Sequence, residues 1–97
     1  MVSTLHGRWV AERLRGGDSY GLRDDARESL LQDYERTGFA YQDYPGTPGY
    51  GISLSRLSWA ASQVERLPDM RLLWAGEQSW DGHQDVLVSQ KVDSADL

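Results

Sequence analysis

The stretch "RDDARESLLQDYERTGFAYQDY", Arg23 to Tyr44, joins the clearest helical pattern of the chain to an alternating pattern that follows it. Its apolar residues recur at helical spacing and predict one buried face: Ala26, Leu30, Leu31 and Tyr34. Acidic residues occupy the first turn, where Asp24 or Asp25 is expected to cap the helix, and Gly38 stands where a left-handed terminating residue belongs. These residues therefore predict a helix that ends at Gly38, followed by a short strand over Phe39–Tyr44.

Two further helices are expected on either side of this stretch. "STLHGRWVAERLR", residues 3–15, repeats apolar residues at helical spacing after Ser3 or Thr4 as cap, although Gly7 weakens the pattern. "ISLSRLSWAASQVERL", residues 52–67, begins with strand-like alternation and continues with helical spacing. We favour a helix from about Ser55 to Leu67, capped by Ser53 or Ser55 and stopped by Pro68, and leave open whether the segment begins as a strand.

The C-terminal part, residues 70–92, predicts a β-hairpin that turns at Asp81-Gly82, because this pair tolerates the type I′ turn that twisted strands prefer. The expected opposed pairs are Trp80 with His83, Ala75 with Val88, and Leu73 with Gln90. The predicted fold is α+β, with about three helices packed on a small antiparallel sheet that includes this hairpin. We expect a single compact domain over residues 1–92 and a short acidic tail over residues 93–97.

That register divides the hairpin into two faces. The inner face is expected to carry Leu73, Ala75, Val86, Val88 and Val92. The outer face is expected to carry Leu72, Trp74, Trp80, His83, Asp85, Leu87 and Lys91. Such an apolar outer face predicts either a covering element or a binding partner. The alternative is a bulge at Ala75-Gly76 that turns Trp74 into the core.

Composition limits the classes of function. The chain has 97 residues, a formal charge of −5, no cysteine, and nine arginines against one lysine. The acidic balance argues against duplex DNA or an anionic membrane as partner, since both require a concentrated basic surface. We expect a cytoplasmic protein, because the chain has no disulfide framework, signal peptide or apolar span. The arginine excess suggests a bacterial or phage origin.

The search for catalytic chemistry is mostly negative. The histidines are His6 and His83, and "DGHQD", Asp81 to Asp85, places one of them between carboxylates. A hairpin tip offers no pocket that excludes water and too few ligands for a metal, so we expect no catalytic residue, no metal site and no cofactor. The enzymatic alternative is a small oligomeric enzyme or ligand-binding domain with a pocket near His83 and Asp85, and with Tyr41 close by.

A winged-helix DNA-binding protein is the third hypothesis. In it, residues 55–67 form the recognition helix and the hairpin forms the wing. The proposed wing carries two basic and three acidic residues between Arg71 and Val92, the reverse of what phosphate contacts need. Nucleic acid is therefore not the expected partner.

The remaining hypothesis is recognition of another protein. "YQDYPGTPGYG", Tyr41 to Gly51, is rich in tyrosine, and its prolines reduce the entropy lost when the segment is presented to a partner. The alternative is a connector whose tyrosines fold back onto the core. The predicted partner-contacting residues are Tyr41, Tyr44, Tyr50, Trp74, Trp80 and His83. We expect a small acidic, non-enzymatic binding module, of the inhibitor or immunity type, that occupies a basic surface of a larger protein; a second copy of the chain is the other candidate partner.

Overall fold

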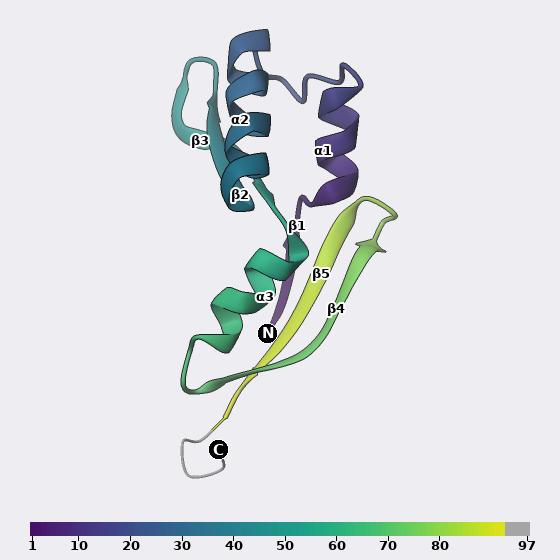
Figure 1. Ribbon diagram of the computed structural model, residues 1–97, viewed down its shortest axis with the longest axis vertical. Coiled ribbons are helices and arrows are strands. Elements are labelled where there is room, and N and C mark those ends of the chain that lie inside the picture. Colours follow the sequence, from purple (N-terminus) through teal and green to yellow (C-terminus); the bar gives the residue numbers. More distant parts are fainter. Residues whose placement is uncertain (93–97) are drawn as a thin grey trace.

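The structure, a computed structural model, describes residues 1–92, which contain three helices and five strands (Figure 1). In chain order these are β1 (Val2–Leu5), α1 (Arg8–Arg15), α2 (Asp24–Thr37), β2 (Phe39–Tyr44), β3 (Thr47–Ser55), α3 (Leu57–Glu65), β4 (Met70–Trp80) and β5 (Gln84–Lys91). The predicted α+β class is confirmed, with two antiparallel sheets, β1–β5–β4 and β2–β3, in place of one. The predicted acidic tail, 93–97, lies outside the described residues.

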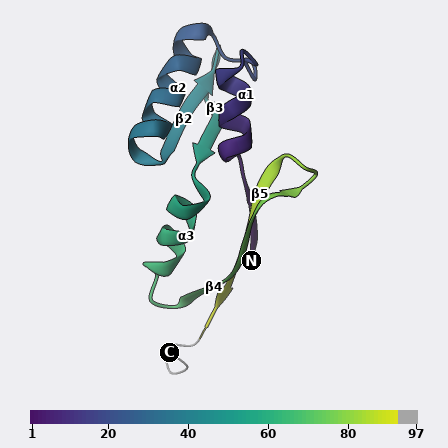
Figure 2. The same cartoon turned by 45° about the vertical axis from the view of Figure 1, so that its right-hand side comes forward.

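The molecule is elongated, with extents of 49 × 27 × 23 Å. Its radius of gyration is 15.0 Å, above the roughly 13 Å typical of a compact domain of about 100 residues. Figures 1 and 2 show two lobes: a helical lobe of α1, α2 and the β2–β3 hairpin, and a sheet lobe of α3 and the β1–β5–β4 sheet. Where the lobes meet, the Ser55 N–H donates to the His6 carbonyl at 2.9 Å. No helix of residues 1–92 has the length and hydropathy of a membrane span.

The helical lobe holds the main hydrophobic core. Leu30 and Tyr34 of α2 are buried, as their spacing predicts, and Gly38 ends the helix with a left-handed φ of 85°. The other fully buried members are Val10, Ala11, Leu14, Leu22, Ala40, Ile52 and Leu54. The predicted cap is wrong: Arg23 occupies the cap position without a side-chain cap bond, while Asp24 and Asp25 lie in the first turn, where they favour the helix dipole.

The predicted first helix begins too early. Val2–Leu5 form β1, which pairs antiparallel with β5, and the helix begins only at Arg8, after Gly7. Neither Ser3 nor Thr4 therefore caps it. Pairing with a distant strand outweighs the weak local helix signal here, since Gly7 already disfavours a helix through this point.

The Tyr41–Gly51 segment is part of a hairpin and not a simple loop. β2 runs to Tyr44, the chain turns at Pro45-Gly46, and β3 begins at Thr47. β3 then continues to Ser55, so the ambiguous segment does begin as a strand. The third helix starts at Leu57, with Arg56 in the cap position, and the predicted caps Ser53 and Ser55 are both in β3.

The turn between β4 and β5 lies at Asp81-Gly82, whose φ values of 55° and 62° are those that a type I′ turn requires. The predicted register is wrong. Trp80 pairs with Gln84, Ala75 pairs with Leu87, and Leu73 is the extra residue of a bulge between Leu72 and Trp74. A second irregularity lies between Gly76 and Trp80. Each bulge adds residues to β4 alone, so it changes which side chains share a face.

Candidate functional site

The altered register gives the β1–β5–β4 sheet two unlike faces, because directly paired residues of antiparallel strands lie on the same face. Val88 pairs with both Val2 and Trp74, and Val86 pairs with Thr4 and Gly76. One face, here called the tryptophan face, therefore carries Val2, Trp74, Trp80, Val86 and Val88. The opposite face carries Asp85, Leu87 and Ser89, all fully buried. Figure 2 shows α3 on one side of this sheet.

This distribution corrects the predicted faces of the hairpin. Leu73 and Ala75, expected inside, are exposed, whereas Asp85 and Leu87, expected outside, are buried. The irregularity between Gly76 and Trp80 changes the register on this side of the turn, so that Trp74 and not Ala75 pairs with Val88. The bulge considered at Ala75-Gly76 does not occur, and Trp74 is not in the core.

The tryptophans are open to solvent. Trp74 is 50% exposed and Trp80 is 60% exposed, and Val2 at the sheet edge is also exposed. The Trp74 ring lies over Gly76, where an added Cβ would come within 2.8 Å of the Trp74 Cζ2 atom. The absence of a side chain at Gly76 thus leaves room for the indole, and Val86, the pairing partner of Gly76, is buried. The result is a sheet face with two exposed indole side chains beside the half-buried Val88.

Histidines lie at one end of the tryptophan face. His6, Trp80, Asp81, His83 and Gln84 line a cavity of about 130 Å³. The ring centroids of His6 and His83 are 5.6 Å apart. The Gln84 side-chain amide donates to Nε2 of His6 at 3.2 Å, which requires this imidazole nitrogen to be unprotonated. Burial, and secondly the neighbouring His83, lower the pKa of His6, in keeping with a neutral ring.

His83 is held by two aromatic side chains of the helical lobe. The Trp9 ring centroid lies 4.7 Å from that of His83, and the Tyr20 hydroxyl lies 3.3 Å from its Nε2. Burial and the nearby Asp18 raise the pKa of Tyr20, so its hydroxyl keeps its proton and can donate to a neutral imidazole. Among residues 1–92, no group of three histidine or acidic side chains is placed to hold a metal ion.

Asp85 lies apart from this cavity, on the buried face of the sheet. Its Oδ1 accepts the Gln78 N–H at 3.0 Å, and its buried Oδ2 has no hydrogen-bond partner in the described part of the chain. Burial raises the pKa of this carboxyl. Neither Asp85 nor Tyr41 lines the histidine cavity, so the pocket imagined around His83, Asp85 and Tyr41 is not assembled here.

The six predicted contact residues fall into two groups. Trp74, Trp80 and His83 lie in the sheet lobe, whereas the tyrosines lie on the β2–β3 hairpin of the helical lobe (Figures 1 and 2). Tyr41 is exposed and Tyr50 is 69% exposed. Tyr44 is half-buried against the core, and its ring centroid lies 5.5 Å from that of Tyr50. Whether any of these residues contacts a partner stays a prediction.

The sequence pattern does not indicate four members of the site. Val2 precedes the expected first helix, His6 is expected within that helix, and Val86 and Val88 are expected on the inner face of the hairpin. The signal that could have found the first was the alternation of "VSTL", Val2 to Leu5, which is compatible with a strand. The position of Val88 depends on the irregularity between Gly76 and Trp80, which the sequence pattern does not indicate.

Comparison with known proteins gives one partial match. "Acyl transferase 7" of Oryza sativa subsp. japonica is 39% identical over 58 residues, which make up 59% of this chain and 13% of that protein. The chain thus spans a small part of the relative it matches, and the match assigns neither an activity nor its absence. No protein-family model matches the chain. No solved structure matches it either.

Proposed function

We propose that this chain is a non-enzymatic protein-binding module that binds its partner through the tryptophan face. The observation that carries the proposal is the exposure of Trp74 and Trp80, at 50% and 60%, on an apolar sheet face. Indole side chains bury a large area with few rotatable bonds and are among the residues that contribute most to interfaces. A surface of this kind lowers solubility unless something covers it.

The charge of the chain indicates the chemistry of the partner. With a formal charge of −5, the module is attracted to a basic surface, and such complementarity raises the association rate and excludes acidic proteins. A fitting partner therefore has an apolar pocket for an indole ring, surrounded by arginine and lysine side chains. Occupation of such a surface on a larger protein is the action of an inhibitor or immunity-type protein.

Affinity capture with matched variants tests this proposal. The parent chain, Trp74→Ala, Trp80→Ala and the control Tyr50→Ala are immobilised in equal amounts and exposed to the same lysate. We expect a protein that the parent and Tyr50→Ala retain and that both tryptophan variants lose. In a titration with this purified partner, each tryptophan variant should bind about 30-fold more weakly than the parent, a loss of about 2 kcal/mol. Capture that is the same for all four chains, or lost only with Tyr50→Ala, would overturn it. Retention of nucleic acid in place of protein would favour the winged-helix hypothesis.

A second copy of the chain is the other candidate to bind the tryptophan face. Sedimentation of the parent and of Trp74→Ala over a range of concentrations distinguishes the two cases. A dimer that dissociates in the variant would make the tryptophan face a self-association surface, and the partner would then be this chain itself. A parent that stays monomeric leaves the face free for a different protein.

The partial match supports a second candidate, a contribution to acyl transfer. The relative is named as an acyl transferase, and the imidazole of His6 or His83 can accept the proton of a hydroxyl as that oxygen attacks an acyl carbonyl and the original acyl-bearing group departs. Hydrolysis of p-nitrophenyl acetate by the parent, His83→Ala and His6→Ala provides a first measurement. Activity above buffer that both substitutions abolish would favour this candidate, whereas equal rates for all three chains would count against it.

A further inference from the structure

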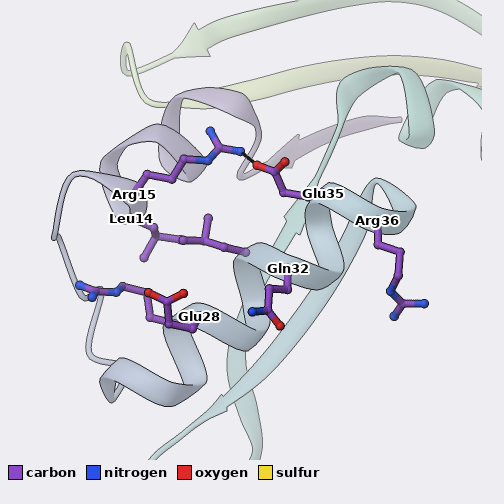
Figure 3. A pocket seen from close by; sticks show the side chains of 8 residues that line it. Leu14, Arg15, Glu28, Gln32, Glu35 and Arg36 are labelled. Atoms are coloured by element: carbon purple, nitrogen blue, oxygen red, sulfur yellow. Dashed lines mark hydrogen bonds and ion pairs between the residues drawn. The ribbon is translucent and has the colours of Figure 1, made fainter.

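A groove of about 610 Å³ lies between α1 and α2, on the helical lobe (Figure 3). Leu14 of α1 belongs to the core and Leu31 of α2 is half-buried, and both line the groove, in which Figure 3 shows the side chain of Leu14. This volume falls within the range typical of small-molecule pockets, roughly 300 to 1,000 Å³. The groove therefore offers an apolar floor that an aliphatic chain can cover.

Charged side chains surround this floor, and two arginines among them, Arg15 and Arg36, form ion pairs with nearby carboxylates. Arg15 forms an ion pair with Glu35 across the groove, drawn as a dashed line in Figure 3. Arg36 forms an ion pair with Asp33 at 3.0 Å, one helical turn away. These two guanidinium groups have carboxylates at bonding distance and do not need a further anion.

Arg27 differs from both. Its side chain is only 19% exposed, and its ion-pair partner, Asp24, lies 3.7 Å away with a side chain that is 93% exposed. Its second contact is a donated hydrogen bond to the Gly17 carbonyl at 3.3 Å. Within residues 1–92, Asp24 is the one carboxylate within ion-pair distance of this guanidinium. The guanidinium of this mostly buried side chain thus has five N–H donors, one hydrogen bond to a carbonyl and one solvent-exposed counter-charge at 3.7 Å, which leaves donors for a further anion.

We propose that the groove binds an amphipathic carboxylate, such as a medium-chain alkanoate. The aliphatic chain packs on the half-buried Leu31, above the buried Leu14, and the carboxylate accepts two hydrogen bonds from Arg27, the geometry that a guanidinium favours. Glu28 and Glu35 on the rim repel ligands with several negative charges, so a single carboxylate fits best. This site lies in the other lobe from the tryptophan face and goes beyond the protein-binding function proposed above.

Titration with octanoate, 1-octanol and acetate tests the two halves of the proposal separately. Binding is followed through the backbone amide shifts of the isotope-labelled chain. Octanoate is expected to shift amides of α1 and α2 and to bind at least about tenfold more tightly than either 1-octanol, which lacks the charge, or acetate, which lacks the chain. Equal binding of octanoate and 1-octanol, no binding of octanoate, or shifts centred on Trp74 and Trp80 would each overturn the proposal.

Variants locate the contact. Arg27→Gln is expected to weaken octanoate binding about tenfold or more, whereas the control Arg36→Gln, on the same rim but already paired with Asp33, is expected to leave it unchanged. Arg27→Lys keeps the charge but not the forked donor geometry, so its affinity for octanoate should lie between those of the parent and Arg27→Gln. It replaces Arg27→Gln in the test if that variant does not fold. Circular dichroism confirms the fold of each variant. Octanoate binding that is unaffected by both Arg27 substitutions would refute the assigned contact.

Discussion

Gly7 provides the sharpest stability prediction, because it lies directly against the buried carboxylate of Asp85. A methyl group at Gly7 would come within 2.8 Å of the Asp85 Cγ atom and still closer to its Oδ2. Asp85 is 1% exposed, so it cannot swing into solvent to make room. Its Oδ1 also accepts the Gln78 N–H. Substitution Gly7→Ala must therefore displace either the start of α1 or a hydrogen-bonded side chain.

The expected cost follows from these two effects. Overpacking of a well-packed site costs about 1 to 3 kcal/mol, and loss of one buried hydrogen bond adds about 1 kcal/mol. Gly7→Ala should thus lower the free energy of unfolding by about 2 to 4 kcal/mol, equivalent to roughly 10 °C or more in Tm for a domain of this size. Urea denaturation followed by tryptophan fluorescence measures the change.

A double-mutant cycle identifies the cause. Asp85→Ala removes the obstructing carboxylate, so adding Gly7→Ala to Asp85→Ala should cost at least about 1 kcal/mol less than adding it to the parent. Gly16→Ala is the matched control, since Gly16 lies at the other end of α1 with φ −75° and neighbours at 3.5 Å. It should change stability by less than about 0.5 kcal/mol. A Gly7→Ala protein as stable as the parent, or an equal cost with and without Asp85, would refute the reasoning.

Three further outcomes are expected. The pKa of His6 is lowered from its ordinary value of 6.5, so the unfolded chain binds more protons than the folded chain just below that pH. The free energy of unfolding should therefore fall as the pH drops through this value. Urea melts at several pH values measure this trend, and His6→Gln should flatten it. Tyr34→Ala should lower the free energy of unfolding by about 3 to 5 kcal/mol, whereas Trp74→Ala should lower it by about 1 kcal/mol or less. Comparable losses of stability for the two variants in thermal melts would place Trp74 in the structural core. Gly38→Ala should cost about 1 to 2 kcal/mol because φ is 85° there, and a denaturation midpoint equal to that of the parent would contradict this.

Local patterns were sufficient for the elements whose residues interact with near neighbours in the chain. The apolar spacing of α2 and the glycine after it locate this helix, since helical hydrogen bonds join residues four apart. The Asp81-Gly82 turn is equally local, because two residues with positive φ decide where the chain reverses. The alternation of the C-terminal hairpin also predicts Trp74 and Trp80 on an outer face, and both side chains are half exposed or more.

Long-range pairing decided the rest. Val2–Leu5 become a strand because they pair with residues 85–88, at the far end of the chain, and this ladder outweighs the weak local helix signal. The histidine cavity exists only because this strand brings His6 beside Gln84 and His83. The Leu14–Leu31 groove likewise requires two helices that are separate in sequence to lie side by side.

Local sequence patterns were enough to predict the α+β class, the central helix and the reversal at Asp81-Gly82, since each depends on contacts within a few residues. The side chains of β4 and β5 that are exposed depend instead on strand pairing across the whole sheet. The extra β4 residues between Gly76 and Trp80 shift β4 relative to β5, and side chains alternate between faces with a period of two. This shift places Trp74 beside Val88 on the open face, whereas Asp85 and Leu87 are buried on the other face.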